Sequence, residues 1–563
     1  MDAYQDLLWL HAHTKIPIHV IFTLIFSYEI CIIFRKELII FFRRKLMFLH
    51  FSKTFGLALC LSVSALPVFC DDSDSTSTAP LSRSEIVAQI DTILNHPDFR
   101  NCRWGVMITD ANSTTPLYDR DGDKSFIPAS NLKMYTTAAA IDLLGADWRW
   151  KTNFYTNGKV RKGVLNGDLV VVGSGDPTLS GRYFDCGTTE VLRGLAQKLD
   201  KARVHRISGN VIIDDSYMTQ EDYCDSWPWA DIPEWYSTES GAAAINDNCW
   251  DAFIIPAKKI GQLAKIQRVF PTTDFVTFVS EVMTTVPQAQ GGSSSIRIYR
   301  PMDSNVITLS GTLPVDAKPY KEWGSVRYGE RMFAAELRAA LRKAGIRVSG
   351  KSLTLAQLSE NKKQQVAKRE GMTLLYTHES LPLKKVIALI NKPSQNFYAD
   401  MLCRTLDREC GGRGGWDGCD RVVRHWFKDT VGVQPFGMAL ADGSGLSRRN
   451  MVTPQLTVAL LRRMNNGAAP EACSAFYDSL PIAGVDGTIS GRMRNTPAAG
   501  NCHAKTGFIG HMRSLSGYVD DKSGRRWLFS MMANNYISPT SQVNGAQDKI
   551  VALLAGLEGE LTE

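Results

Sequence analysis

The chain has 563 residues, of which 44% are hydrophobic and 21% are charged. This composition is ordinary for a globular protein, and the length supports a large core in roughly two to four domains. The net charge of +7 does not indicate nucleic-acid binding, because basic residues crowd the N-terminus, as at Arg35, Lys36, Arg43, Arg44 and Lys45.

Residues 1–46 form an upstream hydrophobic and basic segment. Within it, residues 16–34 are an apolar run of membrane-spanning length, weakened by His19 and Glu29. Either this run is a membrane anchor, or translation begins at Met47. The second interpretation is favoured.

A signal peptide is predicted over residues 47–70. Lys53 precedes a short apolar stretch, and Ala65 offers a small residue for cleavage. Residues 71–83, rich in Asp, Ser and Thr, predict a flexible linker. We therefore expect an exported protein, in the periplasm or cell envelope, with a membrane anchor only if the upstream run is retained.

The first chemical motif follows a helix signal. Pro128 precedes an alanine-rich apolar run that closes at Gly145, so Ser130 is expected in the first turn, with Lys133 on the same face. A serine needs a neighbouring base, and a buried lysine can serve as one. Taken alone, such a motif is more often a helix cap beside a surface lysine. A second copy at residues 359–362 lies in a polar run and predicts a loop or an exposed helix.

Further elements are expected between the first motif and the second. Residues 159–174 and 207–213 predict β-hairpins, and residues 328–350 predict a helix followed by the start of a strand.

The second motif is Ser394-Gln395-Asn396, after Pro393. Apolar residues that follow predict a helix beginning at or near Ser394. The serine hydroxyl could relay a proton to a leaving group, and the Asn396 amide could bind a peptide. The alternative is a serine that only caps the helix.

The third motif is Lys505-Thr506-Gly507, on a predicted edge strand followed by strands near 515–519 and 527–532. Lys505 would offer a cation to a carboxylate, and Gly507 would let a peptide lie close to the strand. The backbone N–H of Phe508, with that of Ser130, would form an oxyanion hole. The alternative is a lysine that protects a sheet edge.

The order of these three motifs is similar to that of β-lactamases and penicillin-binding proteins. The chain resembles one branch in particular, the low-molecular-mass D-alanyl-D-alanine carboxypeptidase/endopeptidase family. The matching segments also include residues 173–179, 209–216, 227–236, 441–447 and 484–488.

This resemblance implies an α/β fold of the penicillin-binding/β-lactamase-like transpeptidase type, with an antiparallel sheet flanked by helices. It also explains the long gap between the first two motifs by a large, mostly β inserted domain that carries a nested smaller one. We expect the catalytic domain over residues 84–154 and 366–563, with the inserted domains over residues 155–365.

The activity implied is that of a serine-type D-Ala-D-Ala carboxypeptidase, endopeptidase or both, through an acyl-enzyme on Ser130. Peptidoglycan stem peptides are the expected substrates and β-lactams the covalent inhibitors, with no cofactor. The implied catalytic residues are Ser130, Lys133, Ser394 and Asn396, and the implied substrate-binding residues are Lys505, Thr506, Gly507 and Phe508.

The chain departs from the family pattern at Gln395, Asp400 and Phe508, without loss of an atom that the chemistry needs. The family also places an acidic group near the cleft. Asp222 is the candidate, and the alternative is a solvated loop acid.

Of the 12 cysteines, nine follow residue 70, so disulfides can form with at least one thiol unpaired. Their spacing lacks a zinc pattern, and no metal is expected. The rival functions are a serine β-lactamase and an inactive wall-binding protein. The pairing of cysteines and the oligomeric state stay open.

Overall fold

The computed structural model describes residues 81–183, 188 and 190–562. The predictions for residues 1–46, for the signal peptide over 47–70 and for most of the linker lie outside this part of the chain. Within the described part, no helix is both long enough and apolar enough to cross a membrane.

A five-stranded antiparallel sheet carries the third motif, in the order β18-β19-β20-β1-β2. β1 precedes the first motif and β20 follows the third, yet they pair from Arg103 opposite Asn534 to Asp110 opposite Trp527. β18 lies at the edge, as predicted. The bounds are β1 (Arg103–Asp110), β2 (Tyr118–Arg120), β18 (His503–Ile509), β19 (Met512–Asp520) and β20 (Arg526–Asn534).

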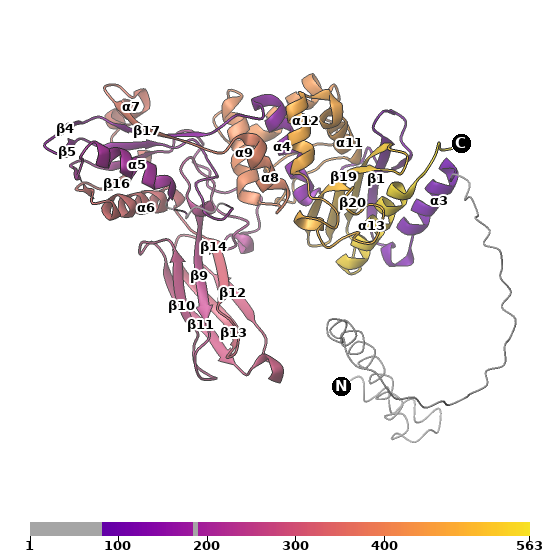
Figure 1. The fold of residues 1–563 in the computed structure, drawn as a ribbon, viewed down its shortest axis with the longest axis horizontal. Helices are drawn as coiled ribbons and strands as arrows, with labels where there is room; N and C mark the ends of the chain where they lie inside the picture. The colour runs from indigo at the N-terminus through magenta and orange to yellow at the C-terminus, as the bar shows by residue number, and fades with distance from the viewer. Residues whose placement is uncertain (1–80, 184–187, 189, 563) are drawn as a thin grey trace, which may run out of the picture. The chain divides into compact units, whose positions relative to one another are not determined.

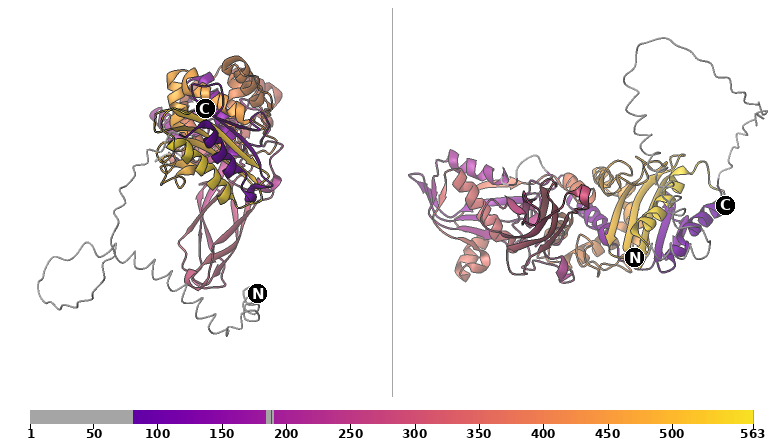
Figure 2. Two further views of the ribbon diagram at one scale, coloured as in Figure 1. Left: turned by 90° about the vertical axis from the view of Figure 1, so that its right-hand side faces the viewer. Right: turned by 90° about the horizontal axis from the view of Figure 1, so that it is seen from below.

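Helices cover both faces of this sheet (Figure 2). Leu94 and Ile550 lie in the core on one face, and Leu132, Val386 and Leu402 lie in the core on the other. On the first face are α3 (Arg83–Leu94) and α13 (Thr540–Gly556); with the second core belong α4 (Leu132–Leu144), α8 (Leu383–Asn391), α9 (Asn396–Glu409), α10 (Asp417–Trp426), α11 (Pro454–Arg462) and α12 (Pro470–Ser479). This arrangement confirms the predicted fold class.

The chain between α4 and α8 forms other sheets, in the orders β16-β8-β6-β3-β17 and β15-β7-β5-β4. Of the hairpin predicted over 159–174, β4 and β5 form an antiparallel pair, whereas β6 lies in the other sheet beside β3 and β8. The prediction of a hairpin over 207–213 is wrong, because β7 and β8 belong to different sheets and pair in parallel with β5 and β6. The helix that follows Ser359 is exposed over most of its length. The bounds are β3 (Lys151–Thr156), β4 (Lys159–Arg161), β5 (Val164–Asn166), β6 (Leu169–Val172), α5 (Glu190–Lys201), β7 (Arg206–Ile207), β8 (Val211–Asp214), α6 (Gly329–Lys343), β15 (Arg347–Val348), β16 (Ser352–Thr354), α7 (Glu360–Lys368) and β17 (Thr373–Glu379).

β17 follows the predicted end of the insertion at residue 365 but pairs with β3, from Thr373 opposite Thr156 to Glu379 opposite Lys151. A strand pair of this length ties β17 to the sheet of the insertion.

Two smaller sheets, β10-β9-β14 and β11-β13-β12, form a group of strands that stands apart from the motif-bearing sheet in Figure 1. Trp250, Val282 and Leu309 of these strands are fully buried in a core shared with β6 and α6. The bounds are β9 (Cys249–Ile255), β10 (Lys265–Phe270), β11 (Thr277–Thr285), β12 (Ser295–Tyr299), β13 (Val306–Pro314) and β14 (Tyr320–Ser325).

Candidate active site

Ser130 and Lys133 meet at the beginning of α4. The structure places Ser130 in a short 3-10 turn, Ala129–Asn131, ahead of the helix and not in its first α-helical turn. Lys133 nevertheless faces the serine, with its Nζ 2.9 Å from Ser130 Oγ. The predicted proximity of amine and hydroxyl is therefore present.

Lys133 is fully buried among oxygen atoms. Besides the serine hydroxyl, its Nζ donates to Asn396 Oδ1 at 2.7 Å and to the carbonyl of Ser444 at 2.6 Å. Burial lowers the pKa of Lys133 to about 8, although the carboxylates of Asp400 and Asp442 favour its charged form. An amine with a pKa in this range can take a proton from a hydroxyl.

The second motif forms the loop that enters α9. The helix begins at Asn396, two residues after Ser394, because Ser394 has a left-handed backbone with φ 65°. Gln395 then caps the helix by accepting a hydrogen bond from the Phe397 N–H at 3.0 Å. Asn396 Nδ2 donates to the Tyr236 carbonyl at 2.9 Å, so this residue links the buried lysine to the chain of the insertion.

Lys505 on β18 faces the second motif. Its Nζ lies 2.9 Å from Ser394 Oγ and 2.9 Å from the Thr506 carbonyl. Burial lowers the pKa of Lys505 well below its usual value, and the positive charges of Lys133 and Arg513 lower it further. The site would therefore gain from a bound anion.

Gly507 was expected to leave room for a substrate, and the structure gives a different reason. A Cβ at this position would lie 2.1 Å from Ser514 Oγ and 2.3 Å from the carbonyl oxygen of Pro128. The absent side chain therefore lets β18 pack against the turn that carries Ser130. Phe508, in contrast, is 55% exposed and lines the cleft.

Two buried carboxylates lie near Lys133. Asp442 accepts hydrogen bonds of 2.7–2.9 Å from backbone and side-chain N–H groups. Asp400 accepts from the Gly443 N–H at 2.9 Å, and its Oδ2 has no hydrogen-bond partner among the described residues. Burial raises the pKa of Asp400 well above its usual value. Sequence reasoning missed this pair, although residues 441–447 had matched the family pattern.

The three motifs meet in one cleft of about 940 Å³. Lys133 and Lys505 lie buried behind its walls. Sequence reasoning gave no role to five polar residues of the lining, Asp231, Tyr236, Arg448, Thr488 and Arg513. Asp231 and Tyr236 belong to the tryptophan-rich segment. The lining comprises Ser130, Pro228, Asp231, Trp235, Tyr236, Pro393, Ser394, Asn396, Gly445, Leu446, Arg448, Thr488, Thr506, Phe508, Ile509, Gly510 and Arg513.

Asp222, the predicted acidic group of the cleft, is not part of this lining. Its Oδ2 lies 2.6 Å from Arg327 Nη1, and the same guanidinium contacts Glu239. The acid that lines the cleft is Asp231. Composition alone could not separate two acids in the same irregular segment, because the difference arises only in the folded chain.

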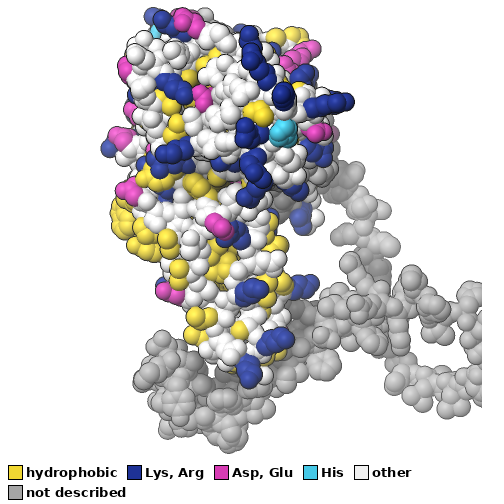
Figure 3. Space-filling model, turned by 90° about the vertical axis from the view of Figure 1, so that its left-hand side faces the viewer, with side chains coloured by type: hydrophobic (Ala, Val, Ile, Leu, Met, Phe, Trp, Pro, Cys, Tyr) yellow, Lys and Arg dark blue, Asp and Glu magenta, His cyan; other side chains and the backbone are white. Residues whose placement is uncertain are grey.

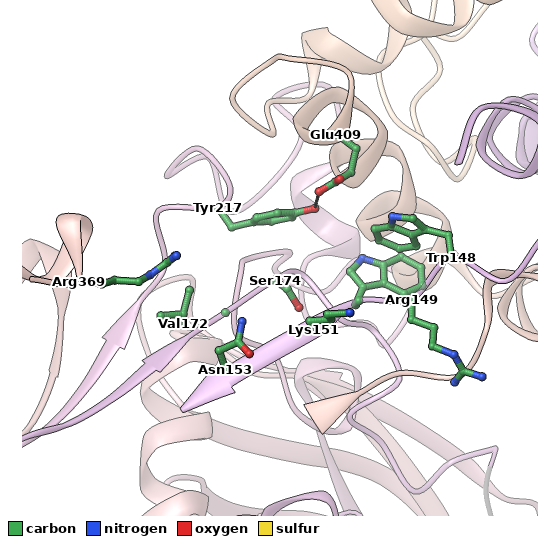
Figure 4. Close-up of a pocket in the computed structure, with 11 residues that line it drawn as sticks. Trp148, Arg149, Lys151, Asn153, Val172, Ser174, Tyr217, Arg369 and Glu409 are labelled. Carbon is green, nitrogen blue, oxygen red and sulfur yellow. Dashed lines mark hydrogen bonds between the residues drawn. The ribbon is translucent and has the colours of Figure 1, made fainter. Parts of the chain in front are cut away.

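A second cavity, of about 340 Å³, lies at the end of β3 near α9 (Figure 4). Trp148, Lys151 and Tyr217 are among its lining residues, and the Tyr217 hydroxyl donates to Glu409 at 2.6 Å. It contains none of the motif residues. Throughout the part of the chain that the structure describes, no cluster of His, Cys, Asp and Glu could hold a metal ion.

The chain is similar to known proteins over most of its length. The model of the D-Ala-D-Ala carboxypeptidase 3 (S13) family matches residues 86–557. A D-alanyl-D-alanine carboxypeptidase of Actinomadura sp. (strain R39) is 31% identical over 509 residues, which is 88% of each chain. The D-alanyl-D-alanine carboxypeptidase DacB of Haemophilus influenzae is 28% identical over 461 residues, 81% of this chain and 90% of the relative.

A solved structure agrees with these relatives. The crystal structure of penicillin-binding protein 4 (dacB) from Haemophilus influenzae superposes with a TM-score of 0.71 at 26% identity, over 84% of this chain and 99% of that one. A crystal structure of the same protein in complex with a β-lactam superposes with a TM-score of 0.67.

Proposed function

Because the chain belongs to the D-Ala-D-Ala carboxypeptidase 3 (S13) family, we propose that it hydrolyses the D-Ala-D-Ala end, or the related cross-link, of peptidoglycan stem peptides. The family predicted from the motifs is thereby confirmed, and the protein is a serine-type peptidase. One observation carries the proposal, the 2.9 Å approach of Lys133 Nζ to Ser130 Oγ at the wall of the cleft.

In this proposal, acyl transfer begins at Ser130. Lys133, in its neutral form, takes the hydroxyl proton, and Oγ attacks the peptide carbonyl. The backbone N–H groups of Ser130 and Phe508 hold the oxyanion of the tetrahedral intermediate. The C–N bond of the intermediate then breaks, and Ser394 relays the proton held by Lys133 to the departing amine. Water, losing a proton to Lys133, hydrolyses the acyl ester, and Ser130 regains its proton.

Substrate binding is assigned to the third motif. Lys505 and Thr506 receive the terminal carboxylate of the peptide, while Asn396 holds its amide. The electrostatics support this assignment, because Lys505 is buried beside other cations and its pKa is lowered. A carboxylate at this place would restore the charged form of the lysine. Gly507 contributes to the same strand, and its missing side chain also lets β18 pack against the turn that carries Ser130.

β-Lactams are expected to acylate the same serine, since a relative with this fold has been solved in complex with one. Because peptidoglycan lies outside the cytoplasm, we also propose that the protein is exported through the signal peptide at residues 47–70. The catalytic domain would comprise residues 84–154 and the end of the chain, with the inserted domains between them. We propose that β3 and β17, which pair with each other, both belong with the inserted domains, so that the insertion would run from about residue 150 to about residue 380 in place of 155–365.

The test uses a fluorescent penicillin and two unlabelled substrates, a D-Ala-D-Ala pentapeptide and a cross-linked dimer. The proposal expects a covalent label on the protein and release of D-alanine, of the free stem peptides or of both. Ser130→Ala should abolish the label and the turnover while leaving the melting temperature within a few degrees.

The rival functions give different results. Fast penicillin turnover without cleavage of either peptide would identify a β-lactamase. A folded protein with neither label nor turnover would identify an inactive wall-binding protein, and it would overturn the assignment of Ser130 and Lys133.

A further inference from the structure

A third concave site is lined by four arginines. This cavity, here called the arginine pocket, has a volume of about 380 Å³. Arg331, Arg338 and Arg342 come from α6, and Arg347 comes from β15. No residue lines both the arginine pocket and the cleft, so the motif residues do not explain this charge.

The four guanidinium groups have no carboxylate partner within the described residues. Arg338 donates to the carbonyls of Gly350 at 2.7 Å and Val348 at 3.3 Å, which fixes it in the pocket. Arg331 lies over the ring of Tyr328, 4.3 Å from its centroid. The side chains of Arg342 and Arg347 contact no polar partner in that part of the chain. They are available to a ligand.

The acidic residue of α6 beside this site does not neutralise it. Glu336 is fully buried, and its two carboxylate oxygens accept from the hydroxyls of Thr272 at 2.6 Å and Thr273 at 2.7 Å. Neutral hydroxyls satisfy this carboxylate, and it forms no ion pair with the arginines. Arg338 and Arg342, in contrast, stand four residues apart on the helix, a spacing at which like charges repel. Without a bound anion, the positive charges of the arginine pocket therefore repel one another.

The rest of the lining suits a ligand that is partly apolar. Phe275, Ala335, Ala339 and Val348 are mixed with the hydroxyl-bearing Thr273 and Ser352. Lys and Arg also outnumber Asp and Glu on the face of the molecule shown in Figure 3. An anion that approaches this face would meet a surface of mostly opposite charge.

We propose that the arginine pocket binds a phosphate ester. A planar guanidinium donates two parallel hydrogen bonds to phosphate oxygens. A phosphate monoester or pyrophosphate has several such oxygens and more than one negative charge, so it can meet several arginines at once. A single carboxylate has too few oxygens to do so. A soluble phosphate monoester and the monoester headgroup of phosphatidic acid supply the same chemistry, and the experiment separates them.

The first experiment titrates inorganic pyrophosphate into the full chain at low salt by calorimetry. We expect saturable binding at one site. The double variant Arg342→Gln/Arg347→Gln should bind about a hundredfold more weakly, since each charged hydrogen-bonding partner contributes about tenfold. The control, Lys265→Gln/Arg297→Gln on β10 and β12, removes the same charge from outside the pocket and should bind like the parent protein.

The second experiment measures sedimentation with vesicles of phosphatidylcholine containing one quarter phosphatidic acid, whose headgroup is a phosphate monoester, and with phosphatidylcholine alone. Pyrophosphate binding without vesicle binding would indicate a soluble phosphate. Binding to the anionic vesicles that the double variant loses would indicate a lipid headgroup. Both results would support the binding of a phosphate group in the arginine pocket.

Two results would overturn the proposal: pyrophosphate that does not saturate, or equal losses in the double variant and its control. Penicillin labelling and the melting temperature check that each variant is folded, because the labelled serine lies outside the arginine pocket. If the double variant melts early, Arg347→Gln alone replaces it, with Arg297→Gln as its control.

Discussion

The side-chain amide of Gln395 donates a hydrogen bond of 3.0 Å to Oδ2 of the buried Asp247. This contact joins the middle of the second motif to a loop of the insertion whose residues 246–248 all have a left-handed backbone. Asp247 also pairs with Arg182 Nε at 3.3 Å. Because Gln395 directly follows the left-handed Ser394, we infer that Asp247 helps to position Ser394 through Gln395.

Replacing the donor tests this inference. Gln395→Glu keeps a side-chain oxygen for the Phe397 N–H but directs a carboxylate at Asp247, which is ionised above its raised pKa of about 6. We expect the rate of penicillin acylation at pH 7.5 to fall about tenfold, from one lost hydrogen bond and like-charge repulsion. Stopped-flow fluorescence measures this rate.

The exchanged pair is the control. Gln395→Glu/Asp247→Asn restores one donor and one acceptor with the direction reversed, and it keeps the total charge. It should recover most of the rate. Asp247→Asn alone is measured as well. If the loss of acylation rate in the double variant equals the combined losses of Gln395→Glu and Asp247→Asn, the two side chains act independently.

The pKa of Lys133 sets the pH dependence of acylation. Burial lowers this pKa to about 8, and only the neutral amine can accept the proton of Ser130. The acylation rate constant should therefore rise about tenfold per pH unit below pH 8 and level off above it. Pre-steady-state labelling between pH 6 and pH 10 checks this limb, and a rate that falls as pH rises through 8 would exclude Lys133 as the base.

Sequence reasoning predicted the elements that local pattern determines. The apolar run after Pro128, the edge strand of Lys505 and the hairpin of β4 and β5 all follow from spacing and turn residues. It could not predict features that depend on distant chain segments. The role of Gly507 depends on Pro128 and Ser514, which meet it only in the folded sheet.

The acidic residues show the same limit. Asp222 and Asp231 have the same chemistry, but in the fold Asp222 pairs with Arg327 while Asp231 lines the cleft. Likewise, the sequence marked Gln395 as a departure from the family pattern, but the reason lies in Asp247, which is remote in sequence and adjacent in space.

The packing of β18 on the serine turn predicts a strong effect at Gly507. A Cβ in Gly507→Ala would overlap Ser514 Oγ and the carbonyl oxygen of Pro128, so the strand or the turn must shift. Overpacking of this kind costs about 1–3 kcal/mol. We expect a lower melting temperature and a slower labelling of Ser130, measured by scanning fluorimetry and penicillin labelling.

Gly491→Ala is the control, because Gly491 does not line the cleft and a Cβ at this position would meet no atom within 4 Å. It should leave stability and labelling nearly unchanged. Equal effects at both glycines would refute the packing explanation.

The disulfide between Cys403 and Cys419 joins α9 to α10, with a sequence separation of 16 residues. A cross-link across a loop of this length restricts the unfolded chain and contributes about 3 kcal/mol. Cys403→Ala/Cys419→Ala should therefore lower the free energy of unfolding in urea by about this amount. The acylation rate well below the melting temperature should change less than the stability, since Asn396 lies about two helical turns before Cys403 on α9. The exposed free thiol of Cys410 provides the control, and Cys410→Ala should leave the urea midpoint unchanged. A double variant as stable as the Cys410 variant would show that the cross-link contributes nothing to the stability of the fold.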